Sequence, residues 1–300
     1  MQKEILVLYH GNCDDGFGSY LSAYLHFGDK ADYVAAHHNE SFFKKIKYKN
    51  YQHIYLLDIS FPIDIMQFLL NNNKKITVID HHQSALAIVP AFRENKQIQI
   101  NLDMSRSGAM MSWQYFHPEK AVPLLIKLIE DVDLWRFTHQ ESKFFNKALR
   151  SYPRHLDFWQ DLLKNDTKVL ELVADGYTID RYFNHQLLEI SNHAIEITLN
   201  NIPGLMVNAN HSFVSEIGNY LAKKCGTFAL VWRHECDGIA CSLRSMPGID
   251  VAHLAEKYGG GGHAKQAAFR LRDLNELFKL ITDEKTAHQA NQNLSFSKPN

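Results

Sequence analysis

The sequence predicts an α/β protein with two domains. Its first half alternates strand-like and helix-like segments, which is typical of a parallel sheet with helices on both faces. Several strand-like segments are continuous apolar runs, as strands buried on both faces require. A helical stretch then leads to a second, smaller α/β unit. The length of 300 residues also favours two domains over one.

Hydrophobic periodicity places the elements of the first half. It predicts strands at 4–10, 31–36, 53–58, 75–80 and 97–101. It predicts helices near 16–27, 40–47, 62–72, 107–117 and 121–131. Amphipathic helical sequence follows from about 155 to 200 and is expected to connect the two domains.

The segment Asn200-Asn-Ile-Pro-Gly204 is the strongest signal for a break in regular secondary structure, and we expect a domain boundary and a hinge there. The expected division is a first domain over 1–185, a linker over 186–204, a second domain over 205–283 and a polar tail over 284–300. The second domain is predicted to have strands at 205–208, 227–233, 238–244 and 266–272, with helices at 212–224, 250–257 and 274–282. Asp237-Gly238 predicts a hairpin turn between two of these strands.

Composition excludes several classes of function. The formal net charge of −1 leaves no basic coat, so tight binding to long duplex nucleic acid is not expected. The four cysteines form no CxxC pair and no disulfide framework, which fits a reducing cytoplasm. The first strand is too short to be a signal peptide, and no apolar run approaches the ~20 residues that span a bilayer. We therefore expect a cytoplasmic protein without a membrane partner.

Acids and imidazoles stand where three apolar strands end. One strand leads into Asp80-His81-His82, another ends at His10, and a third ends at Asp58. Carboxyl ends of neighbouring parallel strands face one crevice. Carboxylates and imidazoles gathered there suit a manganese-like or zinc-like divalent ion. The sequence thus indicates metal-dependent chemistry.

Each of these residues also has an ordinary structural interpretation. Asp14 and Asp15 could belong to an acidic helix N-terminus, and Asp58 could cap the next helix. Asp80 and His81 on a neighbouring strand favour the metal interpretation. A carboxylate such as Asp58 can bridge two ions ~3.5–4 Å apart, as in many phosphoesterases. Asp80 is expected to orient an imidazole, and His82 to face the substrate.

Further segments suggest anion or metal contacts. Asp131 lies at the end of an apolar helix, where a cation would offset the unfavourable helix dipole, although a solvated acidic end is the alternative. Arg106 and Ser107 precede a helix and could contact phosphate or simply cap that helix. The run Gly259-Gly260-Gly261-Gly262-His263 could cradle an anion or act as a flexible hinge. Arg244, at a strand end, could face the same ligand or the solvent.

Together these residues resemble the DHH phosphoesterase superfamily, in the branch with a C-terminal DHH-associated domain. The resemblance follows the chain in order, through His10 to Gly16, Asp58, Asp80-His81-His82, Asp131 and Gly259 to His263. It implies two divalent ions, most commonly Mn²⁺, with Mg²⁺ or Co²⁺ as alternatives. The ligands it implies are His10, Asp14 or Asp15, Asp58 as the bridge, His81 and Asp131. It also implies that Arg244 and the segment from Gly260 through Gly261 and Gly262 to His263 grip the substrate.

The first motif departs from the family's usual D-x-D pattern, because Asn12, Asp14 and Asp15 do not reproduce it; Asp15, directly before Gly16, aligns best. The implied mechanism is attack by a water that two cations activate, with Asp80, His81 and His82 as the catalytic triplet and His82 as proton shuttle or phosphate contact.

The chain shows neither an extra oligonucleotide-binding domain nor a basic groove, and long single strands would need such a track. We therefore expect a short substrate, a linear dinucleotide such as pGpG or an oligoribonucleotide of a few residues, cut to mononucleotides. Alternatives are an exopolyphosphatase or pyrophosphatase, a cyclic-nucleotide phosphodiesterase, or a metal- and nucleotide-binding sensor without turnover. A homodimer is compatible with the sequence.

Overall fold

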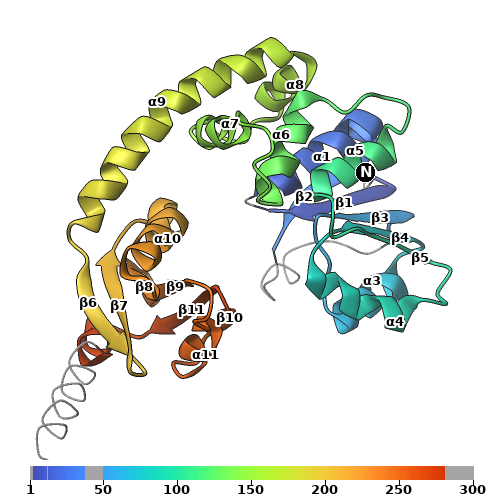
Figure 1. Cartoon of the computed structure of the whole chain (residues 1–300). Helices are drawn as coiled ribbons and strands as arrows, with labels where there is room; N and C mark the ends of the chain where they lie inside the picture. Colours follow the sequence, from blue (N-terminus) through green and yellow to red (C-terminus); the bar gives the residue numbers. More distant parts are fainter. Residues whose placement is uncertain (1–2, 12, 38–49, 281–300) are drawn as a thin grey trace, which may run out of the picture. The chain divides into compact units, whose positions relative to one another are not determined.

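The computed structural model describes residues 3–11, 13–37 and 50–280, in two compact units, Met1–Asp180 and Arg181–Asn300. The helix predicted at 40–47 and the tail predicted at 284–300 lie outside the described residues. Within those residues, no helix combines the length and the apolar character needed to cross a membrane. Each unit has its own sheet and its own hydrophobic cores, so each is described by itself (Figure 1).

The first unit contains a five-stranded, entirely parallel sheet in the order β2-β1-β3-β4-β5. Its strands are β1 (Ile5–His10), β2 (Ala31–Ala36), β3 (His53–Leu57), β4 (Ile76–Asp80) and β5 (Ile98–Leu102). All five begin and end within one residue of their predicted bounds. The apolar runs are confirmed as buried strands, since Leu6, Leu56 and Val78 are almost completely excluded from solvent.

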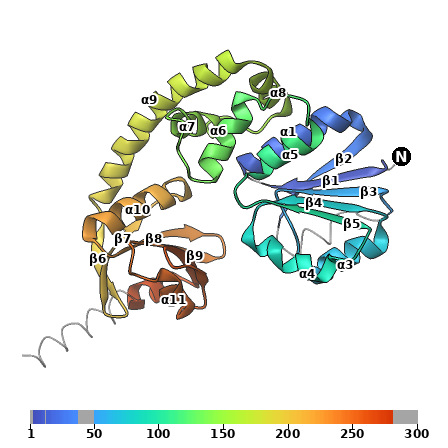
Figure 2. The same ribbon diagram turned by 45° about the vertical axis from the view of Figure 1, so that its right-hand side comes forward.

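Helices cover both faces of this sheet, as predicted (Figure 2). One face carries α1 (Asp14–Phe27) and α5 (Gly108–Phe116); the other carries α3 (Ile63–Asn72) and the short α4 (Val89–Phe92). On the second face, Met66 and Leu69 of α3 pack against strand residues such as Leu56. Short 3-10 turns lie at Gly28–Lys30, Gln83–Ile88 and His211–Phe213.

A helical subassembly packs on α1 and α5. It consists of α6 (Leu124–Asp133), α7 (Ser142–Leu149), α8 (Leu156–Lys164) and the beginning of α9 (Asp166–Ser191). Trp159 and Phe145 are fully buried in its core. Helix α7, which the sequence analysis did not predict, is tied to α9 because Lys143 and Lys147 both pair with Asp180.

The second unit contains a six-stranded mixed sheet in the order β10-β11-β9-β8-β7-β6. Its strands are β6 (Ile195–Leu199), β7 (Ile202–Asn208), β8 (Phe228–Glu235), β9 (Gly238–Ser245), β10 (Gly261–His263) and β11 (Gln266–Leu271). Helix α10 (Val214–Cys225) packs on one core of this sheet, and α11 (Val251–Glu256) with a helix at 274–280 packs on another. The predicted turn at Asp237-Gly238 is confirmed, because Glu235 pairs with Gly238 across the β8–β9 hairpin.

The boundary between the units differs from the predicted one. It falls at Asp180–Arg181, inside α9, whereas the segment expected to be a linker, 186–204, contains the end of α9 and strand β6. Asn200 and Asn201 form a two-residue hairpin turn, since Leu199 pairs with Ile202. Their φ angles of 54° and 62° are the left-handed values that a type I′ hairpin requires. The asparagine pair is therefore a turn within the second sheet, and the predicted hinge there is not seen.

Candidate metal centre

Six side chains, from five elements of the first unit, meet at the carboxyl edge of the parallel sheet. Strand β1 ends at His10, β3 is followed directly by Asp58, and β4 is followed by His81 and His82. Because these strands are parallel neighbours, their carboxyl ends reach the same place. We call the group the strand-end cluster; its members are His10, Asp15, Asp58, His81, His82 and Asp133.

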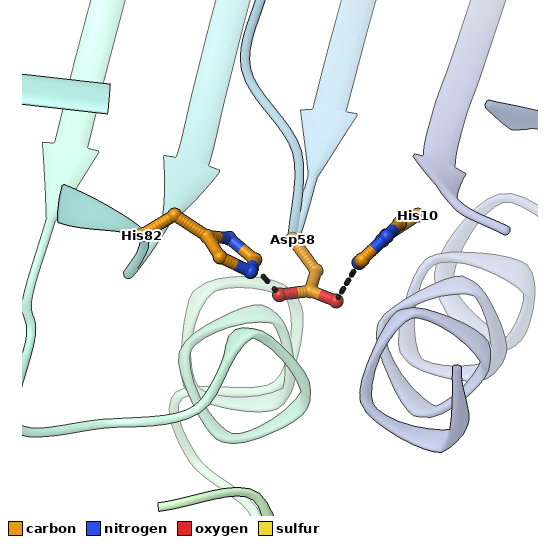
Figure 3. A group of neighbouring side chains, drawn as sticks. All are labelled: His10, Asp58 and His82. Atoms are coloured by element: carbon orange, nitrogen blue, oxygen red, sulfur yellow. Dashed lines mark hydrogen bonds and ion pairs between the residues drawn. The ribbon is translucent and has the colours of Figure 1, made fainter. Parts of the chain in front are cut away.

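Asp58 is the centre of the cluster (Figure 3). Its Oδ2 lies 3.2 Å from His10 Nδ1, and its Oδ1 lies 3.1 Å from His81 Nε2 and 3.9 Å from His82 Nδ1. Only 1% of Asp58 is exposed, and its φ of 57° is left-handed, a conformation that aspartate adopts more readily than most residues. Two groups with metal-ligand spacing share it: His10–Asp58–His82 and Asp15–Asp58–His81.

Asp15 enters the cluster from the first turn of α1. Its carboxylate accepts hydrogen bonds from Gly108 N at 2.7 Å and Ala109 N at 2.9 Å, at the start of α5. Gly108 also lets the start of α5 pack closely against Asp58, because a Cβ there would lie 2.5 Å from Asp58 Cβ. Burial, together with the charges of Asp58 and Asp133, raises the pKa of Asp15 well above its usual range.

Asp80 orients His82. Its Oδ1 lies 2.7 Å from His82 Nδ1 and also accepts hydrogen bonds from the backbone amides of His81 and His82. This matches the expectation that Asp80 fixes an imidazole, and it leaves Nε2 as the ring nitrogen of His82 that can meet a ligand. The hydrogen bond to Asp80 raises the pKa of His82 to about 9.

Asp131 is placed outside the cluster, and Asp133 is placed inside it. The carboxylate of Asp131 accepts hydrogen bonds from the loop that follows α6, at Thr138 N, Thr138 Oγ1 and His139 N, and from Ser142 Oγ at the start of α7. Asp133 Oδ2 instead lies 3.5 Å from His81 Nε2. Both oxygens of Asp131 already accept hydrogen bonds from the residues that follow α6, so Asp133, two residues further along, is the acid that the structure places beside His81.

Asp14 also points elsewhere. It pairs with Arg154 Nε at 2.8 Å and Arg150 Nε at 3.5 Å, so Asp15 is the first-motif acid that the structure brings to the cluster. Ser107 is fully buried and caps α5 by accepting a hydrogen bond from Met110 N, which leaves it no surface for phosphate. Arg106 is partly exposed and lies 3.9 Å from Glu130.

The residues expected to grip substrate from the second unit lie on three neighbouring strands. Gln266 pairs with Arg244 on one side and with His263 on the other, so the three residues share one row of the sheet. Arg244 donates a hydrogen bond to Ser215 Oγ of α10. The last two glycines of the run, Gly261 and Gly262, lie in strand β10, and a Cβ at Gly260 just before it would lie 2.1 Å from Ala268 O. Close packing against β11 therefore explains Gly260, while Gly261 has open space around its Cβ position.

Two members of this neighbourhood were not singled out from the sequence. Asp133 lies two residues after Asp131 on α6, and the sequence does not show which of the two acids faces the cluster and which binds the following loop. Cys13 caps α1, and its Sγ lies 3.3 Å from Asp58 Oδ2. The available signal for Cys13 was its position two residues before Asp15, where a D-x-D motif carries its first acid.

The strand-end cluster fits divalent cations. Asp58 Oδ1 is buried and accepts no hydrogen bond of acceptable geometry, although His81 Nε2 is near. Three carboxylates, of Asp15, Asp58 and Asp133, lie close enough that their mutual repulsion raises the pKa of Asp15 and contributes to the raised pKa of Asp133. Bound cations would relieve this repulsion. The mixed imidazole and carboxylate donors suit borderline divalent ions.

The first unit is thus an α/β domain whose parallel sheet carries a candidate metal centre at its carboxyl edge. The DHHA1 domain family matches residues 205–286. The uncharacterized protein R106 of Acanthamoeba polyphaga mimivirus is 26% identical over 283 residues, which cover 86% of this chain and 65% of the viral protein. The oligoribonuclease NrnB of Bacillus subtilis (strain 168) is 25% identical over 309 residues, which cover 92% of this chain and 75% of NrnB.

Two solved structures share the fold. The pGpG-specific phosphodiesterase PggH of Vibrio cholerae matches with a TM-score of 0.54 and 15% identity, over 96% of this chain and 97% of PggH. An exopolyphosphatase-related protein of Bacteroides fragilis matches with a TM-score of 0.52 and 14% identity, over 90% and 87% of the two chains. Residues 205–286 thus match a DHHA1 domain, and the findings together support a DHH-superfamily phosphoesterase with this domain at its C-terminus.

Proposed function

We propose that this chain is a phosphodiesterase that hydrolyses linear dinucleotides or very short oligoribonucleotides, of the pGpG type, to mononucleotides. The observation that carries the proposal is Asp58, which two ligand groups share at one sheet edge. A carboxylate shared in this way suits a two-ion centre for phosphoester cleavage. Manganese is the ion we expect, with magnesium or cobalt as substitutes.

In this proposal His10 and Asp58 hold one ion, and Asp15, Asp58, His81 and Asp133 hold the other. The bound ions supply Lewis acidity and lower the pKa of an attacking water. Asp80 keeps His82 in one tautomer and orientation through the 2.7 Å contact to Nδ1. His82 Nε2 is then the side-chain atom placed to contact the phosphate or to carry a proton.

An exposed aromatic pair beside the cluster supports a substrate with nucleobases. Trp135 and Phe137 follow Asp133 closely, and their rings meet edge to face with centroids 4.8 Å apart. Trp135 is 66% exposed, yet both residues have left-handed φ angles of 54° and 50°. Such backbone strain in bulky residues persists only where surrounding contacts impose it. An exposed indole held in this way provides a surface on which a base can stack.

The relatives support the same substrate class. NrnB is named an oligoribonuclease, and PggH, which shares the fold, is named pGpG-specific. The exopolyphosphatase-related neighbour makes polyphosphate the competing substrate to include in the assay. The roles of Arg244 and of Gly260 to His263 as substrate contacts remain part of this proposal.

The test is hydrolysis of pGpG by the full chain with manganese, followed by separation of the products. We expect two mononucleotides, slower cleavage as the oligoribonucleotide lengthens, and little release of phosphate from polyphosphate. Asp58→Asn should reduce kcat/KM by more than about 100-fold, because it weakens both ligand groups. Polyphosphate cleavage in place of dinucleotide cleavage would contradict the proposal, and nucleotide binding without any product would favour the sensor.

Asp14 and Asp15 provide a matched pair for this assay. Asp15→Asn should impair hydrolysis and manganese binding together, because Asp15 lies in the cluster. Asp14→Asn should change both by less than about threefold, because Asp14 pairs with Arg150 and Arg154 outside the cluster. The reverse order of effects would mean that the ligands have been assigned wrongly.

A further inference from the structure

Cys13 lies within the strand-end cluster and makes contacts that the proposed mechanism does not use. Its Sγ is 3.3 Å from Asp58 Oδ2 and 3.5 Å from His10 Nδ1. Those two atoms are themselves 3.2 Å apart. One sulfur, one nitrogen and one oxygen therefore form a compact triangle, contributed by the end of β1, the start of α1 and the end of β3.

The size of this triangle is that of a metal coordination shell. With ordinary bond lengths, a tetrahedral zinc ion holds its sulfur, nitrogen and oxygen ligands about 3.4–3.6 Å from one another. The contacts of 3.2, 3.3 and 3.5 Å need only small adjustments to reach these values. A second observation also points to cations at this carboxylate: Asp58 is 1% exposed, and its other oxygen, Oδ1, which lies 3.1 Å from His81 Nε2, accepts no hydrogen bond of acceptable geometry.

We propose that Cys13 is a ligand of the divalent ion held by His10 and Asp58, and that its sulfur biases this position toward zinc and away from manganese. The inference deepens the proposed function and rests on the strand-end cluster being a metal centre. Thiolate ligands select zinc and other thiophilic ions, whereas carboxylates suit manganese and magnesium. The second ion, among Asp15, Asp58 and His81, has no sulfur donor and keeps a preference for harder ions.

Binding requires one proton to leave. The Cys13 thiol donates its hydrogen to Asp58 Oδ2. The ion replaces this hydrogen, and the proton passes to solvent as the thiolate binds. No oxidant or reductant takes part.

The competing explanation is that Cys13 merely caps α1, since Gly16 N donates a hydrogen bond to its sulfur at 3.0 Å. Two variants separate the explanations. Cys13→Ser and Cys13→Asp both keep a side-chain oxygen that can accept this hydrogen bond, so the start of α1 is preserved. Cys13→Ser removes the thiolate, a strong ligand for zinc. Cys13→Asp replaces the soft thiolate with a hard carboxylate. Cys236→Ser removes an exposed thiol from the β8–β9 turn and serves as the matched control.

The measurement is titration of the metal-free full chain with Co²⁺, followed by the sulfur-to-cobalt charge-transfer absorption in the near ultraviolet. We expect this band in the native chain and in Cys236→Ser, and its loss in both Cys13 variants. Competition with a chromophoric chelator should show at least about a tenfold loss of zinc affinity in Cys13→Ser. Cys13→Asp should lower the ratio of zinc affinity to manganese affinity by a similar factor.

A charge-transfer band that survives in Cys13→Ser, or an unchanged ratio of zinc to manganese affinity in Cys13→Asp, would overturn the inference. These readouts do not depend on turnover. A chain that shows the band but does not cleave pGpG would refute the proposed function and leave the ligand assignment standing. A chain that cleaves pGpG without the band would support the proposed function and refute Cys13 as a ligand.

Discussion

At the scale of single residues, Asp131 and Asp133 show how two similar acids on one helix do different work. Asp131 accepts hydrogen bonds from the loop after α6, and this loop carries the strained pair Trp135 and Phe137. Asp133 faces His81. Hydrogen bonds from Ser142 and Thr138 outweigh burial and hold the pKa of Asp131 below its usual range, whereas burial raises the pKa of Asp133. The carboxylate of Asp131 is thus satisfied by the residues that follow α6, whereas that of Asp133 faces the strand-end cluster.

This contrast gives a paired prediction. Asp131→Asn should lower the free energy of unfolding by about 1–3 kcal/mol, because it weakens several buried hydrogen bonds. Asp133→Asn should leave that free energy unchanged or higher in metal-free protein, while it weakens manganese binding. Urea denaturation with EDTA and a manganese titration measure the two effects. A stable Asp131→Asn combined with normal manganese binding by Asp133→Asn would show that the roles are assigned incorrectly.

His53 makes stability depend on pH. Burial, together with nearby Lys75, lowers its pKa from an ordinary 6.5 to about 4, while Nε2 lies 2.9 Å from Thr77 Oγ1. Between these pH values the unfolded chain binds a proton that the folded chain does not. The contribution of neutral His53 to stability is therefore fully present above about pH 6.5 and is lost as the pH falls toward 4.

His53→Gln should therefore make the urea midpoint less dependent on pH between 6.5 and 4, because the variant has no imidazole to protonate. The midpoint is measured across this range in the presence of EDTA, so that metal binding does not contribute. His155→Gln, which changes an exposed histidine of the same unit, is the control and should keep the native dependence. An equal slope for native protein and His53→Gln would exclude His53 as the cause.

At the scale of elements, the close contact between α7 and α9 depends on a glycine. A Cβ at Gly176 would lie 2.0 Å from Phe144 O, and the rings of Phe144 and Tyr177 stack with centroids 3.8 Å apart. Gly176→Ala should therefore destabilise the chain by about 1–3 kcal/mol, even though alanine favours helix formation. Thr178→Ala, at an exposed position of α9, should be neutral or slightly stabilising. Urea denaturation distinguishes them, and a stabilised Gly176→Ala would contradict this packing.

Elements with a clear apolar pattern could be predicted from the sequence, whereas elements that depend on contacts with distant residues could not. The parallel strands carry continuous apolar runs, so their bounds could be predicted closely from the sequence. Helix α7 was missed because Lys143 and Lys147, which look like solvated charges, are held by Asp180 on another helix. Asn200-Asn201 was correctly predicted as a break, but its left-handed φ angles make it a hairpin rather than a hinge.

Part of the strand-end cluster could likewise be predicted from the sequence. His10, Asp58 and His81 follow from strand ends in a parallel sheet, so topology alone brings them together. Asp131 could not be distinguished from Asp133, because that choice depends on which acid the following loop surrounds. Cys13 was not proposed because a single cysteine has many ordinary roles, and only its distances to His10 and Asp58 distinguish it.

At the scale of the whole molecule, the strand-end cluster belongs entirely to the first unit, whose cores are separate from those of the second. Manganese should therefore stabilise only the first unit. At a free concentration 100 times the dissociation constant, one bound ion adds about 2.7 kcal/mol. Thermal unfolding with and without manganese should show one transition that moves and one that does not.

The tryptophans make this assignment measurable. Trp113, Trp135 and Trp159 lie in the first unit and Trp232 lies in the second. In Trp232→Phe, tryptophan fluorescence reports only the first unit, while circular dichroism reports both. We expect the fluorescence transition to shift with manganese and the remaining circular dichroism transition to stay. A single transition that shifts as a whole would mean that the units unfold together.

The left-handed backbone of Asp58 also limits how this position can change during evolution. Glycine and asparagine suit a φ of 57° but lack the negative charge, and glutamate keeps the charge but adopts this backbone poorly. Chemical similarity and conformational fit therefore point to different replacements. A lineage that drifts by single substitutions finds no neutral neighbour of Asp58, and a saturation library at this codon should return aspartate alone among the active clones.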